Sequence, residues 1–289
     1  MLKFHPPGFG QKFTQTSLGT IAYYTQAQGI TETPIVFLHS FGGGSSAYEW
    51  SKVYPFFEST IAPDLIGWGD SSHPARDYRP EDYVMMVAEF LEKISDQPVT
   101  LVAASLTGAL AIRLATQRPE LVRSLFLVCP SGFDDFGQNA GRRIPLDIIN
   151  TPILDRIIYT IGATNDLAVR NFLENFLFAN RDRITPEIVN AYLESARKSN
   201  AEYAALSFLR GDLYFDLSLY LPQLNTPTAI VWGNQALFTD VNLGRRIAAA
   251  NPQAIRRFEV VPESGVLAHL EQPAIVARLL KQWINSETD

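Results

Sequence analysis

Short apolar runs alternate with longer amphipathic segments along most of the chain. Val84, Val87, Leu91 and Ile94 recur at steps of three and four, which places them on one face of a helix that begins near Pro80. Strands that alternate with helices are typical of an α/β fold whose mostly parallel sheet is covered by helices. Further helices are predicted at 105–119 and 272–285, a hairpin strand at 19–26, and other strands at 34–39, 59–64, 98–103, 125–129, 228–232 and 257–261.

The alternation breaks between Cys129 and Thr228. Roughly residues 141–221 contain several predicted helices rich in Ile, Leu and Phe, and no predicted strand. Helices inserted between two strands most simply form a cap over the carboxyl edge of the sheet, where open α/β sheets bind ligands. We therefore predict a core of residues 1–135 and 222–289 and a helical cap of residues 136–221.

Composition and charge exclude several classes of protein. The chain has 289 residues, of which 46% are hydrophobic and 19% charged, enough for a sizeable core. A net charge of −6 without any basic run argues against nucleic acid or an anionic membrane as the main partner. No apolar run has the length of a signal peptide or a membrane span, so we expect a cytoplasmic protein.

Cys129 is the only cysteine, which excludes an internal disulfide and a multi-cysteine metal site. Because it ends the apolar run "LFLVC", we predict a buried structural thiol. We expect neither a cofactor nor a metal.

Four motifs occur in an order that resembles the α/β-hydrolase superfamily, in particular its cap-bearing branch of small esterases, lactonases, dehalogenases and C–C hydrolases. The resemblance covers nearly the whole chain and implies an α/β-hydrolase fold. The family patterns are the "HGFGG" oxyanion loop, "DxxGxGxSxxP", the strand that delivers the catalytic acid, and "CGHxxHLEQP". Here they read "HSFGGG" (39–44), "DLIGWGDSSHP" (64–74), "LNTPTAIVWG" (224–233) and "SGVLAHLEQP" (264–273).

The resemblance also predicts a nucleophile elbow at Ser105, which follows a predicted strand and precedes a predicted helix. The tight turn needs small residues two positions to either side, and Ala103 and Thr107 meet this requirement. By the same resemblance, the N–H groups of Leu106 and Phe41 form the oxyanion hole. The alternative is a serine that only caps a helix.

Two positions depart from the family pattern. The catalytic acid is expected in "WGxxD", but Ala236 follows Trp232-Gly233-Asn234-Gln235. The catalytic histidine is expected after the glycine of "SGH", but Val266 follows Gly265. Removing the base from a serine triad lowers kcat by about 10⁶, so that a turnover of about 10 s⁻¹ falls to about 10⁻⁵ s⁻¹. Ordinary Ser-His-Asp hydrolysis is therefore not expected.

Other residues are candidates to replace the missing pair. Of the four histidines, His269 is nearest to the vacancy, although the family often has a structural histidine there as well. His39 is expected to support the oxyanion loop, and His5 and His73 lie in a Pro-rich tail and after a turn. Substitute acids are Asp134 and Asp135, because some family members take their acid from the strand before the cap.

The leading hypothesis is a non-catalytic or very weak hydrolase that binds a small, largely apolar molecule under the cap. Ala236 and Val266 make the pocket floor more apolar, which suits ligand retention better than chemistry. A second hypothesis is an esterase, lactonase or thioesterase in which Ser105 acts on an ester-like substrate with an unusual base. A third is a pseudoenzyme whose protein partner covers the cap, and a fourth is a pair of engineered substitutions that trap a substrate.

Overall fold

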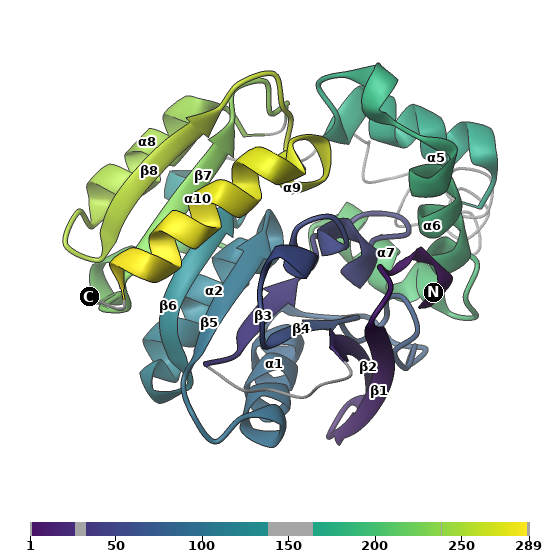
Figure 1. Ribbon diagram of the computed structural model, residues 1–289, viewed down its shortest axis with the longest axis horizontal. Coiled ribbons are helices and arrows are strands. Elements are labelled where there is room, and N and C mark those ends of the chain that lie inside the picture. Colours follow the sequence, from purple (N-terminus) through teal and green to yellow (C-terminus); the bar gives the residue numbers. More distant parts are fainter. Residues whose placement is uncertain (1, 27–32, 138–163, 238, 288–289) are drawn as a thin grey trace.

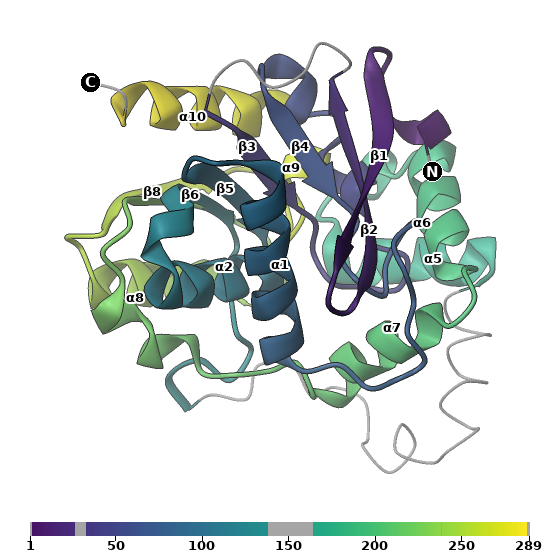
Figure 2. The same cartoon turned by 90° about the horizontal axis from the view of Figure 1, so that it is seen from below.

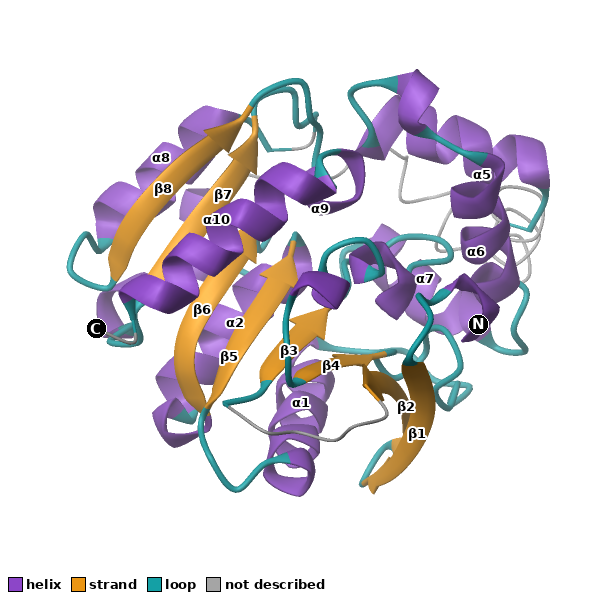
Figure 3. Ribbon diagram, in the orientation of Figure 1, coloured by secondary structure: helices purple, strands orange, loops and turns teal. Residues whose placement is uncertain are grey.

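The computed structural model describes all residues except 1, 27–32, 138–163, 238 and 288–289, and it arranges an eight-stranded sheet between helices (Figures 1 and 3). The strand order is β1-β2-β4-β3-β5-β6-β7-β8. The first two strands pair antiparallel with their neighbours, and every pair from β4 to β8 is parallel. The strands are β1 Phe9–Thr16, β2 Gly19–Gln26, β3 Ile35–Leu38, β4 Thr60–Pro63, β5 Val99–Ala104, β6 Val122–Val128, β7 Thr228–Gly233 and β8 Ile255–Val261.

Helices cover both faces of this sheet (Figure 2). One face carries α1 Pro80–Ile94, α2 Leu106–Gln117 and α8 Val241–Ala250, and the other carries α10 Pro273–Ser286. The short helix α9, Ala268–Glu271, precedes α10. Because both faces are covered, every residue of β5 and β7 is buried, as expected of central parallel strands.

The order of elements confirms the predicted α/β class with a mostly parallel sheet. The strand β4 ends at Pro63, close to the predicted end near Asp64, whereas β6 begins at Val122 and not at 125, and β8 begins at Ile255 and not at 257. The strand β1 and the helix α8 were not assigned from the sequence. The edge strand β1 exposes part of its side chains, including Phe13, so it has no continuous apolar run to mark it.

Local signals explain where the helices begin. The helix α1 starts at Pro80, and the carboxylate of Asp82 accepts the N–H of Arg79 at 2.8 Å, which completes one half of a capping box. Shorter helical turns occupy Leu2–Phe4, Ala47–Trp50, Tyr54–Phe56, Pro119–Leu121, Asp135–Gly137, Leu173–Leu177, Arg181–Arg183, Leu217–Leu219 and Leu221–Gln223.

Among the described residues between β6 and β7 in the sequence, three α-helices occur: α5 Asp166–Phe172, α6 Pro186–Ala196 and α7 Ala201–Arg210. They contact loops that follow the carboxyl ends of the parallel strands. A Cβ atom added to Gly44 would lie 2.3 Å from the carbonyl oxygen of Tyr192, and one added to Gly67 would lie 2.7 Å from Cβ of Ala204. Residues 138–163 of the predicted cap lie outside the described residues, so the boundaries 136–221 stay a prediction.

The single thiol of the chain is packed in the core. Cys129 is buried, its Sγ accepts the N–H of Gly233 at 3.3 Å, and burial raises the pKa of its thiol to about 12. This thiol is therefore protonated and packed in the core. Among the residues described, no helix is long and apolar enough to span a membrane.

Candidate active site

Ser105 occupies the turn between β5 and α2, with φ 56° and ψ −131°. A residue with a side chain rarely adopts this backbone conformation, which costs about 1–3 kcal/mol. The first turn of α2 also requires a small residue, because a Cβ atom on Gly108 would lie only 3.0 Å from Cβ of Pro130. The Ser105 side chain makes no capping hydrogen bond to α2, so the geometry does not support the alternative of a helix-capping serine.

His39 holds the loop that carries the predicted oxyanion donor Phe41. Its Nε2 accepts the N–H of Leu65 at 2.9 Å, which makes Nδ1 the protonated nitrogen that donates to the carbonyl of Ser40 at 2.7 Å. His39 is fully buried and neutral in this arrangement. His39 therefore connects the oxyanion loop to the loop after β4. Both of its ring nitrogens are hydrogen-bonded, so neither is free to accept a proton in catalysis.

Backbone donors remain unused at the predicted oxyanion hole. The N–H groups of Phe41 and Leu106 have no hydrogen-bond partner within the part of the chain that the structure describes. The preceding N–H, that of Ser40, instead donates to the carboxylate of Glu49 at 2.7 Å. Two unpartnered N–H groups are what an oxyanion hole requires, although their role stays a prediction.

Ala236 and Val266 lie on neighbouring loops that follow β7 and β8. The N–H of Gln235 donates to the carbonyl of Ser264 at 3.0 Å, and a Cβ atom on Gly233 would lie 2.0 Å from the carbonyl oxygen of Gly265. Both side chains are buried, with 9% of Ala236 and 4% of Val266 exposed. These positions are close together, as an acid and a histidine would need to be, but neither side chain has a proton to exchange.

His269 packs against Trp50 and Glu49. Its ring stacks on that of Trp50 with centroids 3.9 Å apart, and its Nε2 lies 3.8 Å from Oε2 of Glu49. The side chain is fully buried, and neither ring nitrogen has a hydrogen-bond partner among the described residues. Burial lowers the pKa of His269, which therefore stays neutral. It makes no hydrogen bond to Ser105 Oγ.

The remaining histidines have other partners. His5 stacks on Tyr24 with centroids 3.7 Å apart and hydrogen-bonds the hydroxyl of Tyr54, and burial lowers its pKa to about 3. Burial also lowers the pKa of His73 to about 4, near the Asp70–Lys198 ion pair. All four histidines of the chain are described, and none donates to or accepts from Ser105 Oγ.

The two candidate acids stand in the loop after β6. Asp135 is buried and accepts the hydroxyl of Ser131 at 2.6 Å and the N–H of Leu217 at 3.1 Å, so both of its oxygens organise the loop. Burial raises the pKa of Asp135. Asp134 accepts the N–H of Gly137 through its backbone carbonyl at 3.1 Å. Asp135 makes no hydrogen bond to Ser105 Oγ or to a histidine among the described residues.

Two buried glutamates near the site were not identified from the sequence. Glu49 lies in "AYEW", where a charged residue inside an apolar stretch is the one signal that marks it. Glu271 accepts the N–H groups of Gly265, Ala179 and Asn180 at 2.5, 3.1 and 3.1 Å, and so joins the loop of Val266 to the inserted helical region. Because Ala179 and Asn180 are far from Glu271 in the sequence, no local sequence pattern marks this contact.

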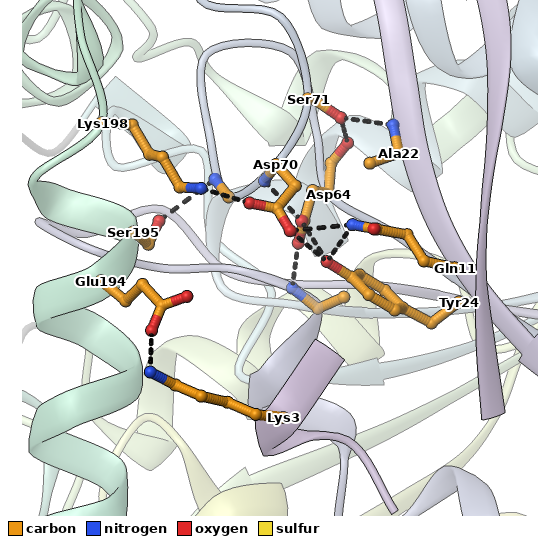
Figure 4. Close-up of polar contacts among 12 residues, drawn as sticks. Lys3, Gln11, Ala22, Tyr24, Asp64, Asp70, Ser71, Glu194, Ser195 and Lys198 are labelled. Carbon is orange, nitrogen blue, oxygen red and sulfur yellow. Dashed lines mark hydrogen bonds and ion pairs between the residues drawn. The ribbon is translucent and has the colours of Figure 1, made fainter. Parts of the chain in front are cut away.

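Asp64, in the "DLIGWGDSSHP" motif, organises a polar cluster that includes Asp70 (Figure 4). It is fully buried and accepts the N–H groups of Ala47 and Asp70, each at 2.8 Å. Burial raises the pKa of Asp64. Burial alone would also raise the pKa of Asp70, but hydrogen bonds from Lys198 and Gln11 lower it to about 2. The Asp70–Lys198 ion pair ties the motif to the segment between α6 and α7.

Comparisons with known proteins agree with this architecture. A family model described as the alpha/beta hydrolase family matches residues 35–279. The Bacillus subtilis protein named "Uncharacterized hydrolase YugF" is 25% identical over 275 residues, which are 92% of this chain and 95% of that protein. A haloalkane dehalogenase from Mesorhizobium japonicum is 35% identical over 136 residues, but these are only 45% of this chain and 43% of that protein.

Solved structures show the same fold at low sequence identity. A serine hydrolase involved in carbazole degradation has a TM-score of 0.76 and 17% identity, covering 96% of this chain and 99% of its own. An esterase from Thermogutta terrifontis has a TM-score of 0.75 and 19% identity, with coverage of 96% and 99%. These identities support the fold alone. With the family model spanning most of the sheet and the helices around it, the chain belongs to the alpha/beta hydrolase family.

Proposed function

We propose that this chain is a non-catalytic, or at most very weakly catalytic, α/β hydrolase that binds a small, largely apolar molecule beside Ser105 and under the inserted helices. The observation that carries the proposal is the placement of the histidines. All four are described, none hydrogen-bonds Ser105 Oγ, and each has other stacking, hydrogen-bonding or electrostatic interactions. A serine hydroxyl without a base is a poor nucleophile.

The geometry near the vacancies supports ligand retention. Ala236 and Val266 are buried and apolar, and Ser105 is only 6% exposed. An acid and a histidine at these positions would have to be desolvated and hydrogen-bonded, whereas alanine and valine favour an apolar ligand. The name of the matched haloalkane dehalogenase refers to a small apolar substrate of that protein, which is compatible with this ligand class.

A second candidate function is a serine hydrolase that uses an unusual base or a base on its own substrate. The strained backbone of Ser105 favours it, because a φ of 56° has a free-energy cost that a purely structural serine would not require. The unpartnered N–H groups of Phe41 and Leu106 also favour it. Esters, lactones and thioesters with good leaving groups would be its substrates.

Hydrolysis of activated aryl esters separates these two functions. We expect the purified protein to hydrolyse nitrophenyl acetate and butyrate no faster than a Ser105→Ala variant, because no group activates the hydroxyl. The matched variant keeps the turn and both oxyanion donors, so it reports the hydroxyl alone. A wild-type rate above the variant's by more than about a hundredfold, the lower range for an acting general base, would overturn the proposal in favour of the hydrolase.

A further inference from the structure

Glu49 places a buried carboxylate directly beneath the oxyanion loop. It is fully buried, Oε2 accepts the N–H of Ser40 at 2.7 Å, and Oε1 accepts the hydroxyls of Ser40 and Tyr192 at 3.0 and 2.8 Å. These three contacts are all donations to the carboxylate, which suits its ionised form. Burial alone would raise the pKa of Glu49, but the hydrogen bond from the Ser40 N–H lowers it, which favours the ionised carboxylate.

This charge is near the place where a ligand oxygen would bind. Ser40 immediately precedes Phe41, so covalent geometry limits the two backbone nitrogens to about 3.7 Å apart. Adding the hydrogen bond from Ser40 N to Oε2 of Glu49 places the Phe41 N–H within about 6.5 Å of the carboxylate. The unpartnered N–H groups of Phe41 and Leu106 need an acceptor oxygen, which a carbonyl group supplies.

The other groups around the site offset the negative charge of Glu49 only in part. The N-terminus of α2, at Leu106, contributes roughly half a positive charge. His39 is neutral because its Nε2 accepts an N–H, His269 is neutral because it is buried, and Ala236 and Val266 carry no charge. An anionic ligand would therefore meet a full negative charge without a cationic side chain at the two triad positions.

We propose that Glu49 determines the charge of the ligand, so that the site binds an apolar molecule with a neutral carbonyl oxygen and discriminates against the carboxylate of the same shape. The inference rests on the proposed function, since it requires a ligand beside Ser105. It assigns to Glu49 a role in specificity that is separate from any role in catalysis.

Binding of isosteric pairs tests this role. The probes are benzylacetone with hydrocinnamate and methyl pentyl ketone with hexanoate, in which a methyl group replaces a carboxylate oxygen. Ligand-observed NMR would give their affinities for the wild type, Glu49→Gln, Tyr192→Phe and Ser105→Trp. We expect the wild type to bind each ketone at least about tenfold more tightly than its carboxylate, the size expected for one charge at this distance after screening.

The variants separate charge from structure. Glu49→Gln should tighten carboxylate binding about tenfold and leave ketone binding within about threefold. Tyr192→Phe removes one hydrogen bond to Glu49 but keeps its charge, so the preference for ketones should persist. In the wild type alone, hexanoate should bind more tightly as pH falls from about 7 to about 5 and its carboxylate becomes protonated. This last measurement applies even if Glu49→Gln does not fold.

The failures are distinguishable. Equal binding of ketone and carboxylate by the wild type, or a hexanoate affinity that does not rise as pH falls, would overturn the role of Glu49 and leave the proposed function intact. Loss of the ketone preference in Tyr192→Phe would also overturn the role of Glu49, because the hydrogen bonds to its carboxylate, and not its charge, would then determine the preference. Binding that survives Ser105→Trp, or no binding of any probe, would contradict the proposed function itself.

Discussion

At the scale of single residues, His269 shows how a catalytic residue type serves packing. Its imidazole stacks on Trp50 and neither of its nitrogens is hydrogen-bonded among the described residues, although Glu49 lies 3.8 Å away. A buried polar group without a partner lowers stability, typically by about 1–3 kcal/mol. The flat ring, and not the proton chemistry of imidazole, is therefore what this position uses.

Two substitutions of His269 test this interpretation. His269→Phe keeps a ring against Trp50 and removes both nitrogens, so we expect a free energy of unfolding equal to that of the wild type or higher by up to about 1 kcal/mol. His269→Ala removes the stack and should lower it by about 3 kcal/mol. Urea unfolding at pH 7 measures both. A His269→Phe protein as unstable as His269→Ala would show that the imidazole itself is needed.

The pH dependence gives an independent check of the same position. Burial lowers the pKa of His269 below the value of 6.5 that it has in the unfolded chain, so as pH falls the unfolded chain binds the proton first. The stability associated with neutral His269 is present above pH 6.5 and is lost as pH falls toward its lower folded value. His269→Phe lacks this loss, so its advantage over the wild type should grow below pH 6.5, by up to about 1.4 kcal/mol per pH unit.

At the scale of elements, the apolar runs predicted most of the fold because the central strands are covered on both faces. The runs at β5 and β7 coincide with strands in which every residue is buried. The edge strand β1 and the helix α8 lacked so clear a signal. The turn at Ser105 was predicted from the resemblance to the family's nucleophile elbow, whose small neighbours are present. Glu49 and Glu271 were missed because their partners are Tyr192 and the 179–180 segment, far away in sequence.

The loops after β7 and β8 carry a prediction of restored catalysis. Ala236→Asp combined with Val266→His should raise hydrolysis of nitrophenyl esters by about a hundredfold over the wild type, because general-base assistance has at least that effect. Each single variant should stay near the wild-type rate, since a histidine needs the acid to fix its tautomer and an acid alone relays no proton. Both positions are nearly closed to solvent, so overpacking can cost about 1–3 kcal/mol.

The control for this gain is Ser105→Ala in the double variant, which should abolish it. Thermal unfolding would establish that the double variant folds. A folded double variant without activity toward either ester would contradict the prediction, and would mean that the oxyanion loop or the inserted helices no longer allow the reaction geometry.

At the scale of the whole molecule, the inserted helices are held to the core by polar contacts as well as by apolar packing. Tyr192 donates to Glu49, the hydroxyl of Ser195 donates to the carbonyl of Ser45 at 3.0 Å, and Lys198 pairs with Asp70. All three residues belong to α6 or follow it directly. Interfaces of this polar kind, typical between domains, allow one part to move relative to the other.

Replacing Lys198 tests whether its ion pair restrains α6 and α7. Lys198→Met should destabilise the attachment by about 1 kcal/mol, a value reduced for the partial exposure of the pair, and should speed amide exchange across residues 186–210 about fivefold.

Hydrogen exchange with mass spectrometry at pH 7 would measure this, with the exposed Lys281→Met on α10 as the matched control. Exchange in α2 should not change, because this helix lies on the face of the sheet and not among the inserted helices. Hydrogen bonds from Lys198 and Gln11 lower the pKa of Asp70 to about 2, so the stabilisation by the ionised carboxylate is present above the unfolded value of 3.8 and disappears as pH falls toward 2. Exchange in 186–210 that matches the Lys281→Met control would show that packing and the other hydrogen bonds hold these helices without the ion pair.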